Sequence, residues 1–361
     1  MTRTIVTNDY RKPGARLLMG ITAYHRFAFA LLSRQLDTRE NVLLEVTWPG
    51  QERPPSRYDK FFTERISLPI EKHFFRKPAQ RAAIDARLRE IVSKYDVSEV
   101  LVAQDLDARM QYCATFFSRP ISVVEDGMSS YVQTADPWRV VQRLITYKLF
   151  LGRRYLNFLG MGLLPAVNCF AFNPVTGFPK VADRNKIKPI AIPAGDGLQD
   201  HAHLDRSLIV VTQPLAEDDL ATEDAEIEVF EALGRAAAAL DMKLLLRSHP
   251  RESLKLIEKR IDAMRRGGAR LDTTTLKDFE VIEEAFATGR NPPVFGFSST
   301  ALSNARRINP RLKVLSAVRW LSRVPPRELE VYVNALASAG VTILQDLSEL
   351  EEALKSLHDE D

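Results

Sequence analysis

Two adjacent carboxylates, Glu125 and Asp126, are followed by Gly127 and come directly after the apolar run 121–124. A carboxylate at the end of a strand is suited to remove a proton as a general base, and the glycine permits a tight turn. Asp-Gly pairs are also common in ordinary turns, and by itself this segment favours a plain turn. The chemistry it would support is proton removal from a hydroxyl group in a cleft.

A histidine between two arginines follows the apolar run 244–246, where residues 247–251 read Arg-Ser-His-Pro-Arg. Arg247 offers forked N–H donors, and His249 is able to donate to a phosphate or to act as an acid. The proline fixes the turn and prepares the start of a helix. The pattern predicts an anion site, although a histidine that only hydrogen-bonds a loop carbonyl explains it equally well.

Hydroxyl residues follow a third apolar run, because residues 294–302 read Val-Phe-Gly-Phe-Ser-Ser-Thr-Ala-Leu. Ser298, Ser299 and Thr300 lead into a helix, where such side chains act as N-caps. The same geometry makes an anion site from the free N–H groups and the helix dipole. Gly296 would allow close approach of the backbone. Ordinary capping and phosphate binding are equally compatible with this motif.

The elements that must position these motifs alternate between strands and helices. In the first half we expect strands at 17–21, 42–46, 100–103 and 121–124, and helices at 24–36 and 78–95. In the second half we expect strands at 208–211, 244–246, 294–296, 314–315 and 341–344, and helices at 219–240, 252–266, 277–287, 300–307, 326–339 and 347–357. This alternation is typical of βαβ units with parallel sheets.

Two such sheets predict an α/β chain of two Rossmann-like domains, residues 1–185 and 186–361, linked through the Pro- and Gly-rich segment 173–197. In open parallel sheets, ligands bind beyond the carboxyl ends of the strands. Each motif directly follows a strand, one in the first half and two in the second. We therefore expect a cleft between the domains, with a base on one wall and a phosphate site on the other.

The ordered set of short motifs resembles the bacterial sialyltransferases, which include the lipooligosaccharide sialyltransferases and the capsular polysialyltransferases. The segments that carry the resemblance are 124–127 (Val-Glu-Asp-Gly) with Ser130 and Tyr131, 212–214 (Thr-Gln-Pro), 247–252 (Arg-Ser-His-Pro-Arg-Glu) and 296–302. Outside residues 124–302 the likeness is limited to the alternating pattern of strands and helices.

The resemblance implies a GT-B glycosyltransferase that moves sialic acid, or a related nonulosonic acid, from a CMP-activated donor to a hydroxyl of a lipooligosaccharide or capsule glycan. It also implies inversion at the anomeric carbon and no need for a metal ion or other cofactor. Glu125 or Asp126 would be the general base, and the pattern leaves open which. His249 would face the CMP phosphate as acid or stabiliser. The same phosphate would be held by Ser298 and Ser299, with Thr300 and Arg247 nearby.

Two other functions are compatible with these residues. A Kdo transferase of capsule or lipopolysaccharide assembly also takes a CMP-sugar and has His-Pro-type motifs. A catalytically inert glycan-binding or assembly protein on the same fold is the alternative from a different class, and the intact acidic and histidine motifs argue against it. Nucleic-acid binding is poorly supported, because no nucleic-acid module is readable in the sequence.

A stretch without acidic residues, 137–182, predicts a basic amphipathic helix. On one continuous helix the basic face would comprise Arg139, Arg143, Arg153 and Arg154, opposite an apolar stripe with interleaved aromatic residues. Such a helix would lie on an anionic membrane surface or dock a polyanionic acceptor. The simpler alternative is a domain helix with its apolar stripe on the sheet and its arginines in water. The acid-rich window 217–231 is interpreted as a solvated helix face.

The composition of the chain excludes several other classes of protein. The 361 residues carry 50 Lys+Arg against 47 Asp+Glu, and the net charge of +3 gives no overall field for nucleic acid. With 27% charged and 45% hydrophobic residues, the chain is neither disordered nor, with two cysteines, a disulfide scaffold. The first residues contain no apolar core of a signal peptide. We expect a cytoplasmic protein that is peripheral on the inner membrane if the basic stretch binds lipid. The uncharged run 155–178 is not expected to span a membrane, because it contains prolines and asparagines.

Overall fold

The computed structural model describes residues 14–51, 53–103, 107–130, 137–155, 166–172, 174–175, 177–178, 181–192, 204–249, 251–288 and 290–358. The chain divides into two compact domains. The first comprises Met1–Asp126, Ala135–Ala171 and Lys180–Ala191, and the second comprises Gly127–Thr134, Phe172–Pro179 and Ile192–Asp361. Compared with the expected boundary at 185/186, the division lies slightly later, and two short segments of the first half belong to the second domain. The segment 173–197, expected to link the domains, lies partly outside the described residues.

The first domain is built on a seven-stranded parallel sheet in the order β3-β2-β1-β4-β5-β6-β7. Its strands are β1 (Ala15–Gly20), β2 (Asn41–Thr47), β3 (Glu64–Pro69), β4 (Val97–Ala103), β5 (Ile121–Val124), β6 (Cys169–Ala171) and β7 (Ile187–Pro189). Leu18 in the centre of β1 is paired with Leu43 and Leu101 on its two neighbours. Strands buried on both faces require continuous apolar runs, and β1, β2 and β5 are buried throughout.

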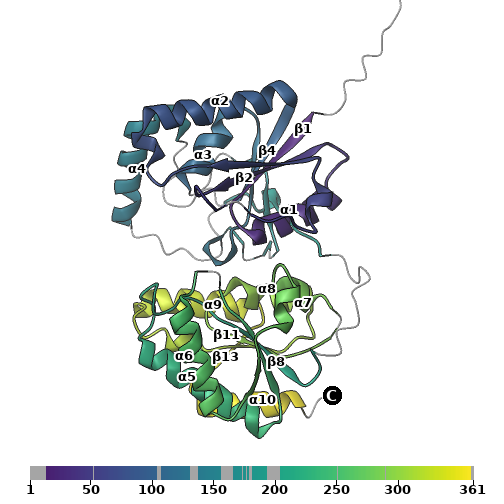
Figure 1. Ribbon diagram of the computed structural model, residues 1–361, viewed down its shortest axis with the longest axis vertical. Coiled ribbons are helices and arrows are strands. Elements are labelled where there is room, and N and C mark those ends of the chain that lie inside the picture. Colours follow the sequence, from purple (N-terminus) through teal and green to yellow (C-terminus); the bar gives the residue numbers. More distant parts are fainter. Residues whose placement is uncertain are drawn as a thin grey trace, which may run out of the picture. The chain divides into compact units, whose positions relative to one another are not determined.

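The described residues around this sheet form the α-helices α1 (Ala23–Gln35), α2 (Pro78–Lys94), α3 (Ala108–Ala114) and α4 (Pro137–Leu151). Figure 1 shows α2 and α3 on one side of the strands and α1 on the other. Thr22 and His25 form a capping box that starts α1, and Pro78 occupies the first turn of α2. α2 turns Ile84, Leu88 and Ile91 toward the core.

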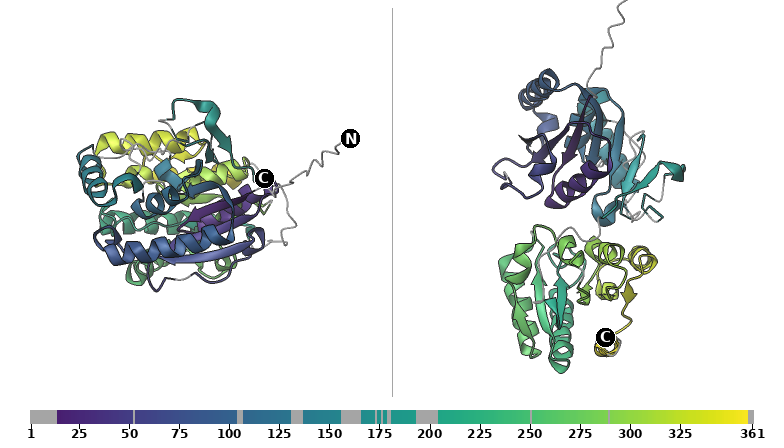
Figure 2. Two further views of the ribbon diagram at one scale, coloured as in Figure 1. Left: turned by 90° about the horizontal axis from the view of Figure 1, so that it is seen from above. Right: turned by 90° about the vertical axis from the view of Figure 1, so that its right-hand side faces the viewer.

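The second domain has a six-stranded parallel sheet in the order β10-β9-β8-β11-β12-β13. The strands are β8 (Ser207–Val211), β9 (Lys243–Arg247), β10 (Arg270–Asp272), β11 (Val294–Gly296), β12 (Val314–Ser316) and β13 (Thr342–Ile343). Its helices are α5 (Glu223–Ala239), α6 (Leu254–Arg266), α7 (Glu283–Phe286), α8 (Thr300–Ile308), α9 (Pro326–Ser338) and α10 (Ser348–His358). The right-hand view of Figure 2 shows the strands of this domain between helices on both sides.

The predicted α/β class and the two Rossmann-like parallel sheets are confirmed. The strands that sequence patterning missed are β3, β6, β7 and β10. Each has only one to three buried or half-buried apolar residues to mark it, and β3, β7 and β10 lie at sheet edges. The helix expected at 277–287 is instead a 3-10 turn, Thr275–Asp278, followed by the short α7. In both sheets the connections reverse direction beside the first strand, between β1 and β4 and between β8 and β11. Ligands of such sheets bind at the carboxyl ends near this reversal.

Candidate active site

The strand ends nearest the reversal in the second domain are joined by a glutamine. Gln213 follows β8, and its Oε1 accepts a hydrogen bond from the Ser298 N–H, 2.8 Å away, at the end of β11. This bond fixes the orientation of the amide and turns its NH₂ group, a pair of donors, away from Ser298. A Cβ on Gly296 would lie 3.0 Å from the Val211 carbonyl oxygen, so the glycine permits the close strand approach expected there.

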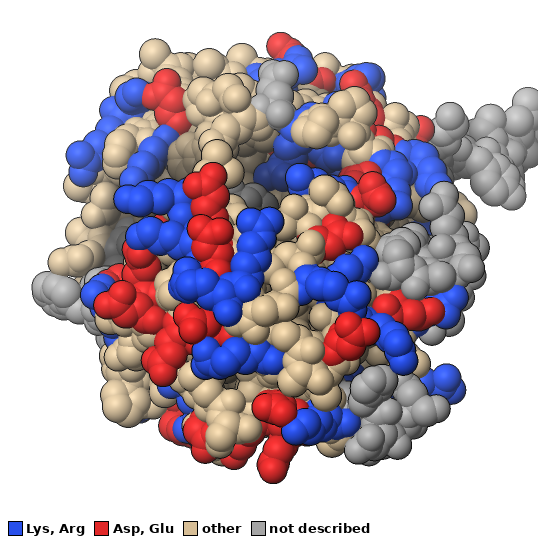
Figure 3. Space-filling model, turned by 60° about the horizontal axis from the view of Figure 1, so that its bottom comes forward, with Lys and Arg blue, Asp and Glu red and all other residues tan. Residues whose placement is uncertain are grey.

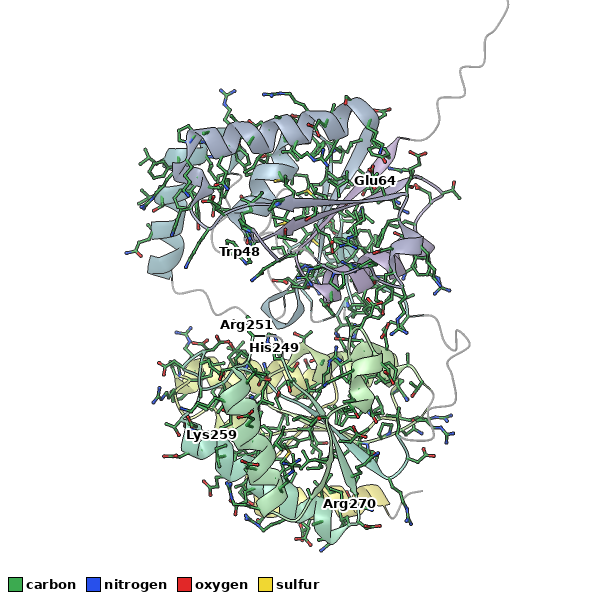
Figure 4. All side chains as sticks on the ribbon, in the orientation of Figure 1. Trp48, Glu64, His249, Arg251, Lys259 and Arg270 are labelled. Carbon is green, nitrogen blue, oxygen red and sulfur yellow. The ribbon has the colours of Figure 1, made fainter. Side chains whose placement is uncertain are left out.

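His249 lies just after β9 at the same end of the sheet. Figure 4 shows His249 and Arg251 together at this end of the domain and Arg270, at the start of β10, at the opposite end. The Nδ1 atom of His249 accepts a hydrogen bond from the Arg251 N–H at 3.2 Å, so the ring carries its proton on Nε2. Among the described residues Nε2 has no hydrogen-bond partner.

The charge state of His249 follows from its surroundings. Burial and the nearby Arg251 guanidinium lower its pKa, against the smaller opposing effects of Glu252 and Asp218. The imidazole is therefore neutral at pH 7 and presents an N–H donor. Arg251 itself is exposed and forms a two-pronged ion pair with Asp218, at 2.9 and 3.3 Å.

A buried carboxylate holds the His249 loop in place. Glu252 Oε2 accepts hydrogen bonds from the His249 N–H and the Thr212 hydroxyl, both at 2.6 Å, while its Oε1 pairs with Arg260. Arg260 is fully buried on α6, and it donates to the Gln213 carbonyl at 2.9 Å and pairs with Glu226 of α5. One ion-pair network thus connects the ends of β8 and β9 to two helices.

The second carboxylate of this network, Glu226, has a raised pKa. Burial raises the pKa of Glu226 to about 7, because the neighbouring Glu252 charge adds to the desolvation and Arg260 only partly opposes them. Two buried carboxylates share one guanidinium, so a proton on Glu226 balances the charge.

The hydroxyl residues are built into the start of α8. Ser299 is the N-cap, and its Oγ accepts from the Ala301 N–H at 3.2 Å. Ser298 is 5% exposed. Gly127, with φ of +75°, packs against the helix, since a Cβ there would lie 2.8 Å from Thr300 Oγ1. The capping role is therefore confirmed for Ser299, whose O–H is still able to donate, whereas the Ser298 O–H makes a long hydrogen bond of 3.5 Å to Gln213 Oε1. The phosphate contact of Ser298, Ser299 and Thr300 stays a prediction.

Arg247 differs from its predicted environment. Its guanidinium donates to the carbonyls of Leu276, at 2.6 Å, and Glu280, at 2.9 Å. These bonds connect β9 to the segment before α7. They favour a structural role for Arg247 in place of the phosphate contact expected from the sequence.

In the first domain, the structure places Glu125 and Asp126 in different environments. Glu125 is fully buried at the end of β5, and its Oε1 accepts from the Tyr24 hydroxyl at 2.5 Å. The Asp126 side chain is 19% exposed, and its Oδ1 lies 2.7 Å from Nε2 of His25. Of the two carboxylates, Asp126 is therefore the more exposed.

Sequence reasoning missed Tyr24, His25 and Arg260, and it gave no role to Gln213 and Glu252, although both lie in segments that carry the family resemblance. Tyr24, His25 and Gln213 lie just after strands, at the positions where ligands of parallel sheets are expected. Their positions after strands could be predicted from the sequence. The sequence does not indicate which of these side chains form hydrogen bonds with one another.

The acid-free stretch does not form one continuous helix. α4 ends at Leu151, Gly152 has φ of +55°, and residues 152–154 form a 3-10 turn. Arg153 is exposed, whereas Arg154 is fixed by Asp85 at 3.2 Å and the Tyr112 carbonyl at 2.7 Å. The single basic face predicted for Arg153 and Arg154 is thus wrong in this part; the side chains of Arg139 and Arg143 lie outside the described residues.

The apolar side of α4 points outward. Val141, Ile145 and Leu149 recur every four residues and are 39%, 61% and 77% exposed, with Phe150 at 41%. On its other side α4 packs Tyr147 against Phe75. The alternative in which this stripe covers the sheet is therefore wrong for these residues. No helix in the described part of the chain has the length and apolar character to cross a bilayer.

The acid-rich window 217–231 is matched by bases from the neighbouring helix α6 and the loop before it. Ion pairs join Asp218 to Arg251, Glu223 to Lys259 and Glu231 to Arg266. On the face that Figure 3 presents, acidic and basic side chains intermingle. Within the described ranges, no three His, Cys, Asp or Glu side chains gather closely enough to hold a metal ion.

Solved structures share this architecture over nearly the whole chain. A protein from Listeria monocytogenes described as a UDP-N-acetylglucosamine 2-epimerase superposes with a TM-score of 0.59 at 12% identity, over 96% of this chain and 88% of that one. The Neisseria meningitidis UDP-GlcNAc 2-epimerase bound to UDP-GlcNAc gives 0.53 at 11% identity, over 96% and 91%. A Siraitia grosvenorii UGT transferase in complex with UDP gives 0.52 at 10% identity, over 95% and 90%.

At these identities the likeness establishes the fold alone, and the chain is a GT-B protein of two Rossmann-like domains. A search of curated proteins finds no match. The family profile described as alpha-2,8-polysialyltransferase (POLYST) matches residues 51–318. The chain therefore belongs to the alpha-2,8-polysialyltransferase family, and it is a glycosyltransferase of the sialyltransferase type.

The buried network predicts effects of unequal size for substitutions at its two carboxylates. Glu252→Ala leaves Arg260, Thr212 and the His249 N–H without their shared acceptor, and we expect the free energy of unfolding to fall by about 3–5 kcal/mol. Glu226→Gln resembles the protonated form and should cost less than about 1 kcal/mol at pH 6. Urea unfolding of both variants measures the difference, and equal losses would contradict it.

The same network predicts a pH dependence. The pKa of Glu226 is raised in the folded state, so its stabilising contribution is complete below its ordinary pKa and is lost as the pH rises through about 7. Glu226→Gln removes this titration. Relative to the unaltered protein, the variant should therefore gain stability between pH 5 and pH 8, as measured by urea unfolding at both values.

Proposed function

We propose that this protein transfers sialic acid, with inversion, from CMP-sialic acid to a hydroxyl of a sialylated glycan of the cell surface. Asp126 takes the proton of the acceptor hydroxyl as its oxygen forms a bond to the anomeric carbon. The bond from that carbon to the CMP phosphate oxygen breaks, and its electron pair leaves with CMP. The α2,8 linkage in the description of its family supports a sialic acid residue as acceptor.

The observation that carries the proposal is the state of His249. Its Nδ1 is occupied by the Arg251 N–H, its lowered pKa keeps it neutral, and its Nε2–H is a donor at the carboxyl edge of the sheet. The N-terminus of the nine-residue α8, capped by Ser299, lies at the end of β11 along the same edge. Helix N–H groups and an imidazole N–H together suit a nucleotide phosphate.

This state favours one of the two roles considered for His249. A departing phosphate has a second pKa near 6 and is therefore stable without a proton at pH 7. A neutral imidazole is a poor proton source but a good fixed donor. We assign His249 as an electrostatic stabiliser of the developing phosphate charge, assisted by the O–H groups of Ser298 and Ser299 and the NH₂ of Gln213.

Burial favours Asp126 over Glu125 as the base. A base must approach its proton within hydrogen-bond distance, and the fully buried Glu125 is engaged by the Tyr24 hydroxyl. The partly exposed Asp126 meets the requirement. The chemistry uses side chains and helix N–H groups, and the independence from metal ions expected from the sequence stays a prediction.

The exposed stripe of α4 supports an association with an anionic membrane surface, where lipid-linked glycans would be presented from the cytoplasmic side. Ile145 and Leu149 offer apolar area, no acidic residue occurs from 137 to 182, and the Arg76 guanidinium lies 5.8 Å from the Phe150 ring. Apolar insertion flanked by basic groups is the combination that binds anionic lipid.

Replacement of the phosphate donor should reduce turnover without unfolding the protein. His249→Ala is expected to lower the rate of transfer from CMP-sialic acid on the order of 10²–10³-fold, because one preorganised donor is lost. Release of CMP, with an α2,8-linked oligosialic acid as acceptor, measures the rate, and His73→Ala, an exposed histidine of the first domain, is the control. Near-normal turnover of His249→Ala would refute the assignment. Turnover with CMP-Kdo alone would favour a Kdo transferase, and no CMP binding would favour an inert glycan-binding protein.

The two carboxylates should respond differently to isosteric changes. Asp126→Asn keeps an acceptor for His25 but is no longer a base, and we expect transfer to fall about 10²–10⁴-fold with CMP affinity retained. Glu125→Gln keeps an acceptor for the Tyr24 hydroxyl, and its rate of transfer should fall less than about tenfold. The reverse order in the same assay would move the base to Glu125.

Membrane binding should depend on the α4 stripe. The double variant Ile145→Ser with Leu149→Ser is expected to float with phosphatidylglycerol vesicles roughly tenfold less than the unaltered protein, because apolar area is lost from the bilayer contact. Leu254→Ser is the matched control, since Leu254 is 78% exposed on another helix. Equal recovery of all variants would contradict a role of the α4 stripe in membrane binding. Equal recovery of the unaltered protein on phosphatidylcholine and phosphatidylglycerol vesicles would contradict a preference for anionic lipid.

A further inference from the structure

We propose that His25 is the positioning residue of the base, and that it acts by a hydrogen bond from its Nε2–H to Asp126 Oδ1. The inference rests on the proposed function, in which Asp126 takes the proton of the acceptor hydroxyl. His25 comes from the first turn of α1, about one hundred residues before the carboxylate in the chain, and both belong to the first domain.

The backbone of the β1–α1 turn determines which nitrogen of His25 carries the proton. Nδ1 accepts hydrogen bonds from the N–H groups of Ile21, at 2.9 Å, and Thr22, at 3.2 Å. A nitrogen that accepts from two N–H groups cannot itself be protonated, so the proton is on Nε2. Nε2 lies 2.7 Å from Asp126 Oδ1 and is therefore the donor of that bond.

These bonds exclude His25 as the proton acceptor of the reaction. Its unprotonated nitrogen is occupied by the backbone, and its other nitrogen already carries a proton. The ring is also fully buried, out of reach of an acceptor sugar. Its contribution to catalysis therefore passes through Asp126.

The local sequence is shaped to bring His25 to this position. Gly20 ends β1, and a Cβ there would lie only 2.9 Å from the Cβ of His25, so a side chain at position 20 would displace the ring. His25 occupies the third position of α1, where its Nδ1 completes the capping box with Thr22. The Arg53 guanidinium holds the Ile21 carbonyl on the other side of the turn.

Consecutive residues of α1 thus separate the two carboxylates of the acidic motif. Tyr24 donates to the buried Glu125, and His25 donates to the partly exposed Asp126. A hydrogen bond to a carboxylate fixes the direction in which its lone pairs point. A base must present a lone pair along the line of the hydroxyl proton, and a displacement of about 1 Å is able to cost up to about 100-fold in rate.

Two amide substitutions separate the roles of the two ring nitrogens. The amide group of asparagine lies where Nδ1 lies in histidine, so His25→Asn keeps an acceptor for the turn but has no donor that reaches Asp126. The amide of glutamine reaches the position of Nε2, so His25→Gln keeps a donor to Asp126 and loses the bonds of Nδ1. Thr22→Ala, which removes only the N-cap, is the control for helix stability.

The test measures kcat and KM for transfer from CMP-sialic acid to α2,8-linked oligosialic acid, with CMP affinity determined separately by calorimetry. We expect His25→Asn to lower kcat about 10- to 100-fold with CMP affinity and both KM values unchanged. His25→Gln should restore most of kcat. Thr22→Ala should lower the unfolding temperature without a change in kcat.

Either of two results would overturn the inference: unaltered kcat in His25→Asn, or equally low kcat in the Asn and Gln variants. Asp126→Asn, measured beside them, separates this failure from failure of the proposed function. If Asp126→Asn is active, the proposed base is wrong; if it is inactive while His25→Asn is active, only the role of His25 is wrong. In the Asp126→Asn background, His25→Asn should have little further effect, because both changes interrupt the same interaction.

Discussion

One buried carboxylate, that of Glu252, holds together the strand ends on which the second domain's chemistry depends. Loops at the carboxyl edge of a parallel sheet leave backbone N–H groups and hydroxyls without partners in the sheet, and a buried group without a partner costs free energy. Glu252 accepts from His249 and Thr212, and Arg260 compensates its charge from within α6. The position of His249 is therefore a property of the network and not of its own loop alone.

In the first domain, too, backbone N–H groups after a strand need an acceptor, and there a histidine provides it. There the imidazole of His25 accepts the N–H groups of the β1–α1 turn and donates to Asp126. A single ring completes the helix cap and orients a carboxylate, so stability and chemistry share one side chain. Because the ring has both roles, a substitution that deletes it would change helix stability and the orientation of Asp126 together. The Asn and Gln variants of His25 each replace one ring nitrogen and therefore separate the two effects.

The architecture itself does not select the reaction. Proteins described as UDP-N-acetylglucosamine 2-epimerases and a UGT transferase share the two-domain fold at 10–12% identity. Function resides in the residues at the strand ends, and here these belong to a polysialyltransferase family. The outward apolar stripe of α4 is a second feature outside the fold's own needs, because burying Ile145 and Leu149 in the domain would have been favourable.

The sequence by itself determined the parallel α/β class, the two-domain organisation and the strand ends at which His249, Ser299 and Asp126 lie. Apolar runs bounded by helical patterns and helix-capping residues are local signals, and such signals can be read from the sequence without a structure. Edge strands such as β10 and the end of α4 at Gly152 escaped, because short runs and a single glycine carry little signal.

Only the tertiary structure decided which side chains meet. It buried Glu125 completely and left Asp126 partly exposed, although the sequence could not distinguish these adjacent residues. It took Arg247 to two backbone carbonyls and joined His25 to Asp126 and Glu252 to Thr212 across 101 and 40 residues of chain. Which distant residues form hydrogen bonds depends on the order of the strands in each sheet. That order cannot be predicted from the residue spacing within a single motif.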